Sequence, residues 1–158
     1  MFSTLLAGRP GEPHLGGMVR SCPSCGTENR VPWARVADVA KCGKCKARLA
    51  PIAAPLEATP EIFDEIVRGA KVPVLVDFWA PWCGPCRTAA PQVERAAGEL
   101  GGKAVVLKVN TELYPQLGAR FRVAAIPHFI VLKRGSVVVA QSGLVPAAQL
   151  VDWARAAA

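Results

Sequence analysis

Short apolar runs recur along the second two-thirds of the chain, separated by segments of mixed polarity. Runs of this length that are rich in valine and other β-formers are typical of strands, and those at residues 74–79 and 104–110 are apolar enough to be buried in the sheet. They predict one short strand and four longer ones, at residues 56–58, 74–79, 104–110, 129–133 and 137–141. Lys133-Arg-Gly-Ser136, between the last two runs, predicts a tight hairpin.

The segments between the runs have helical spacing and helix-start signals. Thr59 is a suitable N-cap for a helix that begins at Pro60 and stops at Gly69. Further helices are predicted at residues 87–97, 116–121 and 146–157, and Pro91 should kink the first of these. The resulting order, βα, βα, βα, ββα, predicts an α/β fold with helices on both faces of a central mixed sheet.

Composition divides the 158 residues into three parts. Residues 1–17 are rich in glycine and proline and predict a disordered leader. Residues 18–50 hold four of the six cysteines and predict a small separate module, and residues 51–158 carry the α/β pattern. The proline-spaced linker at residues 49–55 is short, so the module should stay near the larger domain.

The remaining two cysteines follow the apolar run 74–79, where Cys83-Gly84-Pro85-Cys86 leads into a helix. A helix N-terminus favours negative charge and lowers the pKa of a thiol there. We therefore predict that Cys83 is a nucleophile that attacks disulfides, and that Cys86, one turn later, resolves the mixed disulfide. A metal half-site is the alternative for an isolated C-x-x-C pair. The buried strand before the pair favours redox chemistry.

The other four cysteines form two C-x-x-C pairs, Cys22/Cys25 and Cys42/Cys45, with sixteen residues between the pairs. This spacing is typical of a four-cysteine zinc site. We predict one structural zinc ion per chain, in a closed tetrahedral site that supplies the folding energy so short a module lacks. Two further redox dithiols, or a regulatory disulfide, are the alternatives.

The formal charge of +7 is concentrated near the N-terminus, where residues 1–50 hold eight Lys/Arg and three Asp/Glu. Zinc held by four thiolates would lower the +5 of this part to about +3, so we do not expect nucleic acid as a partner. No segment is apolar over a membrane-spanning length, and the first ten residues make a poor signal peptide. Cysteines paired in this way favour a reducing compartment, and we expect a cytoplasmic location.

Phe78-Trp-Ala-Pro-Trp-Cys-Gly-Pro-Cys86 resembles the active-site signature of the thioredoxin family, and the likeness extends from about Pro55 to Ala158. With the four-cysteine module ahead of it, the chain is similar to the zinc-containing second thioredoxins of bacteria, which also share Asn29-Arg-Val-Pro32 and Lys108-Val-Asn-Thr-Glu112. The resemblance implies a thioredoxin fold with a small zinc ribbon-like module. It also implies a protein-disulfide reductase of cytosolic proteins, with a thioredoxin reductase as electron donor.

Asp77 is a carboxylate inside an otherwise apolar run. Burial should raise its pKa, which suits proton exchange with Cys86. Lys108 is the charged residue of the neighbouring run, and the resemblance implies that it is the charge partner of Asp77. Exposure on one strand face is the alternative for both residues.

Ile126-Pro127 is the remaining family signal. The matching proline of thioredoxins is cis and faces the dithiol, which implies that the backbone before it pairs with a substrate strand; a simple strand start is the alternative. His128 stands where the family usually has threonine, and we interpret it as a tolerated surface change; a group that titrates near the site or tunes substrate choice is the alternative. The resemblance implies a substrate-binding set of Trp82, Gly84, Pro85, Ile126, Pro127 and Gly143.

The chain contains no G-x-G-x-x-G loop, so we expect no bound nucleotide or flavin, and electrons must come from a partner protein. We expect a monomer. Two other functions stay open: a disulfide oxidase or isomerase, against which the Gly84-Pro85 dipeptide argues, and a redox-regulated zinc-binding module with a chaperone-like role.

Overall fold

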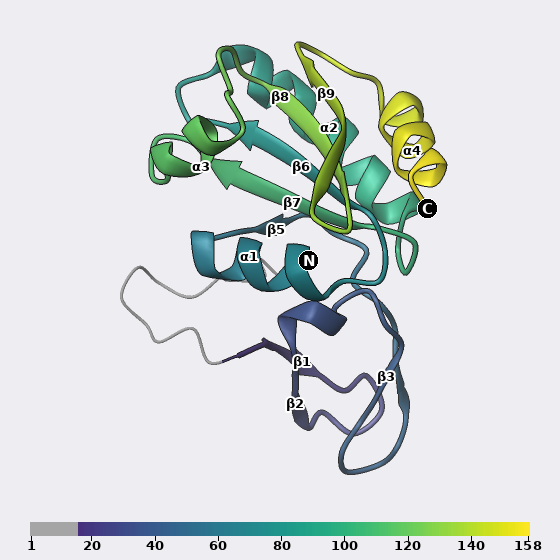
Figure 1. The fold of residues 1–158 in the computed structure, drawn as a ribbon. Coiled ribbons are helices and arrows are strands. Elements are labelled where there is room, and N and C mark those ends of the chain that lie inside the picture. Colours follow the sequence, from purple (N-terminus) through teal and green to yellow (C-terminus); the bar gives the residue numbers. More distant parts are fainter. Residues whose placement is uncertain (1–15) are drawn as a thin grey trace.

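The computed structural model describes residues 16–158, so the predicted leader lies almost entirely outside the described residues. A small N-terminal module lies beside a larger α/β domain (Figure 1). Among residues 16–158, none of the helices combines the length and the hydrophobicity that crossing a bilayer requires.

Two short antiparallel hairpins form the N-terminal module. β1 (Met18–Ser21) pairs with β2 (Glu28–Val31), and β3 (Ala40–Lys41) pairs with β4 (Arg48–Leu49). Each hairpin turn carries one C-x-x-C pair, followed by a residue in the left-handed region: Gly26 at φ 74° and Lys46 at φ 63°. Both turns therefore close in the same way, although only the first uses the residue that favours this conformation.

A five-stranded mixed sheet forms the centre of the larger domain, in the order β5-β7-β6-β8-β9. β5, β7 and β6 are parallel, and β8 and β9 are antiparallel to their neighbours. The strands are β5 (Leu56–Glu57), β6 (Val74–Trp79), β7 (Val105–Asn110), β8 (His128–Lys133) and β9 (Ser136–Ser142). The predicted mixed sheet is confirmed.

Helices cover both faces of this sheet. α1 (Pro60–Gly69) and α3 (Pro115–Arg120) pack on the face that presents Val76 and Phe78, and α2 (Gly84–Glu99) and α4 (Ala147–Ala156) on the face that presents Leu75 and Phe129. α1 begins as predicted, because the Thr59 hydroxyl accepts a hydrogen bond from the Ile62 N–H at 3.3 Å. α2 begins three residues earlier than predicted and so includes Cys86 in its first turn.

The N-terminal module packs on the end of the larger domain that is remote from Cys83. The short 3-10 helix η1 (Trp33–Arg35) lies against α1, where a side chain on Gly69 would overlap the Ala34 methyl group. Gly101, just beyond the last turn of α2, packs against Ala53 of the linker. Because α2 has 16 residues, about 24 Å of helix separates this contact from Cys83.

Candidate functional site

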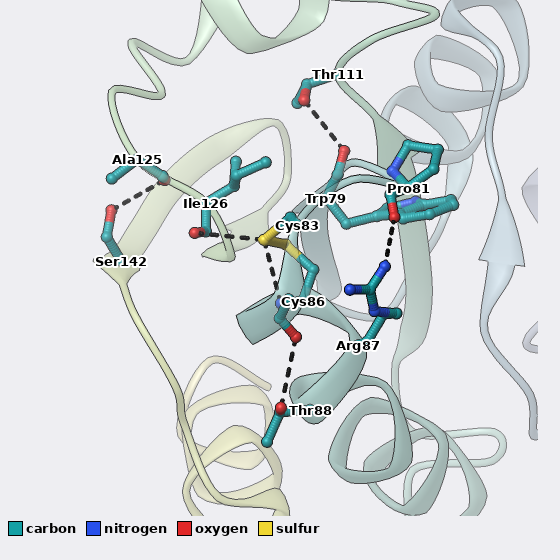
Figure 2. Close-up of a disulfide and its surroundings, with 11 residues drawn as sticks. Trp79, Pro81, Cys83, Cys86, Arg87, Thr88, Thr111, Ala125, Ile126 and Ser142 are labelled. Carbon is teal, nitrogen blue, oxygen red and sulfur yellow. Dashed lines mark hydrogen bonds between the residues drawn. A yellow bond between two sulfur atoms is a disulfide. The ribbon is translucent and has the colours of Figure 1, made fainter.

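Cys83 and Cys86 lie where β6 gives way to α2, and a disulfide joins them (Figure 2). Cys83 is the N-cap, and its sulfur accepts a hydrogen bond from the Cys86 backbone N–H at 3.2 Å. Pro85 occupies the first turn, where backbone N–H groups have no acceptor within the helix, so its missing N–H costs no hydrogen bond. Once the disulfide is reduced, the backbone N–H and the helix dipole would stabilise a negative charge on the Cys83 sulfur.

The two cysteines are equally buried in this oxidised state, each with 4% of its surface exposed. Exposure therefore does not distinguish Cys83 from Cys86. The residues around them are open: Pro81, Gly84 and Pro85 are exposed, and 67% of the Trp82 surface is accessible. A protein partner can therefore reach the disulfide across this rim.

Asp77 lies in the middle of β6 with 1% of its surface exposed, so the alternative of an exposed strand face does not hold for it. Its Oδ1 atom has no hydrogen-bond partner among residues 16–158. Burial raises the pKa of Asp77 to about 7; the positive charge of Lys108 opposes this rise, and the carboxylate of Glu57 adds to it.

Lys108 is the cross-strand neighbour of Asp77 in the β6–β7 register, but its ion pair is with Glu57. The Lys108 Nζ atom lies 3.8 Å from Glu57 Oε1 and 4.5 Å from the centroid of the Trp79 ring. The Trp79 ring N–H donates to Glu57 Oε2 at 3.3 Å. Sequence reasoning missed Glu57; its signal was a lone carboxylate in the strand that pairs with Lys108.

The Ile126–Pro127 peptide bond is cis, as the family resemblance implied, and it lies next to the dithiol. The Ile126 carbonyl oxygen is 3.8 Å from the Cys83 sulfur (Figure 2). The Pro127 carbonyl accepts a hydrogen bond from the N–H of Gly143, whose φ is 98°. His128 is buried, with 9% exposure, so its interpretation as a surface change is wrong.

An open groove of about 560 Å³ runs beside the disulfide between Trp82 and Ile126. Its walls come mainly from α3 and from the segment before Pro127, and small apolar side chains predominate. The lining residues are Trp82, Thr111, Pro115, Gly118, Ala119, Val123, Ala124, Ala125 and Ile126. Of the predicted substrate set, only Trp82 and Ile126 line this groove; Gly84 and Pro85 lie on the exposed helix end, and Pro127 and Gly143 are outside the lining. Sequence reasoning missed the α3 wall.

The four remaining cysteines meet at one point of the N-terminal module. All four sulfur atoms lie within 4.8 Å of one another, with Cys22–Cys45 at 3.6 Å and Cys25–Cys42 at 3.7 Å. Four ligands at the usual zinc–sulfur distance in a tetrahedron are about 3.8 Å apart. The residues present therefore fit a tetrahedral zinc ion.

Electrostatics in this cluster also favour a cation. Hydrogen bonds from the Cys45 backbone, the Lys44 backbone and the Asn29 side chain lower the pKa of Cys42 to about 6. The Ala47 backbone also lowers the pKa of Cys45, but burial and the three neighbouring sulfurs outweigh it and raise that pKa to about 11. A dication at the centre would offset the repulsion between neighbouring thiolates and let all four sulfurs bind in that form.

Comparisons with known proteins agree with this geometry. Residues 54–156 match the family model described as Thioredoxin, and residues 21–47 match the model described as Thioredoxin 2, N-terminal. Thioredoxin C-3 of Corynebacterium nephridii is 35% identical over 136 residues, which are 86% of this chain and 92% of that protein. Thioredoxin 1 of a Nostoc species is 43% identical over 95 residues, covering 60% of this chain and 89% of that protein.

Among solved structures, a mutant thioredoxin from Halobacterium salinarum superimposes with a TM-score of 0.61 at 28% identity. The match covers 66% of this chain and 90% of that one, and therefore corresponds in extent to the larger domain.

Proposed function

The chain belongs to the thioredoxin family, and from this premise we propose that it reduces protein disulfides by dithiol exchange through Cys83 and Cys86. The observation that carries the proposal is the disulfide at the start of α2, with the Cys86 N–H directed at the Cys83 sulfur. This arrangement stabilises the attacking thiolate and holds the resolving sulfur within bonding distance of it.

The exchange has two steps. The Cys83 thiolate of the reduced protein attacks one sulfur of a target disulfide, a bond forms between them, and the other target sulfur leaves as a thiolate that takes up a proton. Cys86 then loses its proton and attacks the Cys83 sulfur, which forms the Cys83–Cys86 disulfide and releases the second target sulfur. Two electrons pass from the dithiol to the target.

Asp77 accepts the proton of Cys86 in this proposal. A carboxyl group with a pKa of about 7 can both take up and return a proton near neutral pH, which an ordinary aspartate cannot do efficiently. Lys108, held by Glu57 and Trp79, is the neighbouring positive charge that keeps this pKa from rising further.

Replacing Asp77 by asparagine should stabilise the oxidised protein at high pH and slow the release of the target. The pKa of Asp77 is about 7 when folded and 3.8 ordinarily, so the folded state holds the proton more tightly. Burial of Asp77 therefore costs the wild type no unfolding free energy below about pH 4. The cost grows as the pH rises and reaches its full value above about pH 7. We expect D77N to gain about 2–4 kcal/mol at about pH 8.5 and almost nothing at about pH 4.

Urea unfolding of oxidised D77N and wild type at these two pH values measures the effect, and the intact disulfide keeps Cys83 and Cys86 from titrating. Equal gains at both pH values would contradict the raised pKa. Release of the target from the mixed disulfide should slow by about 10²-fold in D77N.

The direction of the reaction follows from the redox equilibrium with glutathione. The reduction potential of a reductase of this type should be about −270 mV, whereas that of a disulfide oxidase is about −120 mV. Mixing the protein with graded ratios of reduced and oxidised glutathione, followed by thiol alkylation and mass measurement, gives the potential. The variant C22S/C25S/C42S/C45S controls for thiols of the module. A potential near that of an oxidase would reverse the assignment.

The electrons that regenerate the dithiol come, in this proposal, from a thioredoxin reductase that uses NADPH, and the targets are disulfide-containing proteins of the cytoplasm. We also propose that the four module cysteines hold one structural zinc ion per chain. A closed site of four thiolates has no open position for a substrate, so the ion would stabilise the module and take no part in the exchange.

A further inference from the structure

His128 and Ser142 form a hydrogen-bonded pair directly behind the segment that faces the disulfide. His128 is the first residue of β8 and lies opposite Ser142 in the β8–β9 register. Its Nδ1 atom is 2.7 Å from the Ser142 hydroxyl oxygen, and the Ser142 hydroxyl donates to the Ala125 carbonyl at 3.4 Å. Figure 2 shows this last bond beside Ile126, whose own carbonyl points at the Cys83 sulfur.

The direction of these bonds follows from the groups involved. The Ala125 carbonyl can only accept, so when the Ser142 hydroxyl donates its single proton there, it accepts from His128. In that arrangement His128 carries its proton on Nδ1. Its Nε2 atom is buried and has no hydrogen-bond partner among residues 16–158. Burial lowers the pKa of His128, which favours the neutral ring.

The His128 ring has a fixed position on the face of the sheet opposite Asp77. It packs against Phe78, its cross-strand neighbour, with ring centroids 6.1 Å apart. Successive residues of a strand point to opposite faces, so Asp77 and Phe78 project from different sides of β6. His128 is thus separated from the proton transfer proposed for Asp77 and Cys86. Its hydrogen bond goes to Ser142, which in turn bonds the Ala125 carbonyl.

We propose that His128 is a positioning residue for target binding: through Ser142 it fixes the Ala125 carbonyl, and with it the Ala125–Pro127 segment against which the target disulfide binds. This inference rests on the proposed function. The Gly143 N–H holds the other end of the segment through the Pro127 carbonyl. A segment ordered before binding loses less conformational entropy when an extended target strand pairs with it.

Kinetics on two substrates of different size test this role. In H128L the hydrogen bond to Ser142 is lost while the apolar packing is retained, and S142A removes this bond together with the one from Ser142 to the Ala125 carbonyl. For both variants we expect the KM for insulin to rise about 3- to 10-fold, with kcat within about twofold of wild type. Reduction of cystamine, which is too small to pair with the segment, should stay within about twofold.

H128N is the matched control, because an asparagine amide N–H occupies nearly the place of Nδ1–H and can donate to Ser142. We expect H128N to restore the KM to within about twofold of wild type. The double variant H128L/S142A should be no worse than S142A, since S142A already lacks both hydrogen bonds. A histidine that only fills space would instead give H128N the same defect as H128L, and that result would overturn the proposal.

Nitrogen-15 NMR of the imidazole tests the geometry without any turnover. The chain has two histidines, so H14Q leaves His128 as the single signal. We expect the Nδ1–H tautomer in H14Q and a change of the tautomer ratio in H14Q/S142A; an Nε2–H tautomer in H14Q would overturn the proposal. An inactive wild type would end the proposed function together with the positioning role, whereas an active wild type with an unaltered H128L would end only the latter.

Discussion

Replacing Cys83 by serine is expected to lower the rate of insulin reduction by about 10³-fold or more, to the uncatalysed level. A serine hydroxyl is not ionised at neutral pH, so neither the Cys86 N–H nor the helix dipole can stabilise an attacking anion at this position. The measurement is insulin turbidity with a thioredoxin reductase and NADPH as electron source. Full activity of C83S would refute the catalytic assignment and favour a redox-inert binding role.

Cys86→Ser is the matched variant, because it retains the proposed nucleophile and removes only the sulfur proposed to resolve the mixed disulfide. C86S should form a mixed disulfide with insulin as fast as wild type and then fail to release it, so a covalent adduct accumulates. Mass measurement under non-reducing conditions detects the adduct. An adduct on C83S instead of C86S would mean that the roles of the two cysteines are exchanged.

Replacing Cys42 by serine is expected to release the metal and unfold the N-terminal module. Cys42 is fully buried in a cluster with Cys22 and Leu49 and is one of the four converging sulfurs. The module offers little other core, so the metal should supply most of its folding free energy; zinc-finger peptides gain about 10–16 kcal/mol from such binding. Metal analysis should find one zinc ion per wild-type chain and none per C42S chain.

K44A is the control for C42S, since Lys44 lies in the same turn with an exposed side chain and should leave the metal in place. The module packs at the far end of α2, and the helix places about 24 Å between that end and Cys83. We therefore expect C42S to retain insulin reduction within about twofold. Wild-type protein that folds fully without metal would contradict the structural role of zinc. Loss of reductase activity in C42S would show that the module reaches the catalytic end of the domain.

Several features of this fold were predictable because they depend on neighbouring residues alone. The run at residues 74–79 predicted β6 with its exact bounds, since a short apolar run rich in β-formers and closed by a proline is typical of a strand buried on both faces. Thr59 and Pro60 placed the start of α1 for the same local reason. The start of α2 was less accurate, because Gly84 and Pro85 join the helix only once Cys83 caps it.

Other features depended on contacts between strands that are distant in the sequence, and the spacing of residues along the chain does not reveal those contacts. Sequence alone determined the order of the elements, the two cysteine turns and the dithiol at a helix N-terminus, since hydrophobic period, caps and C-x-x-C spacing are properties of short segments. Only the tertiary structure decided that Glu57 pairs with Lys108 and that His128 is buried against Ser142. The reason is physical: strand order and register set which side chains meet and which lose water, and these in turn set their charge and hydrogen bonds.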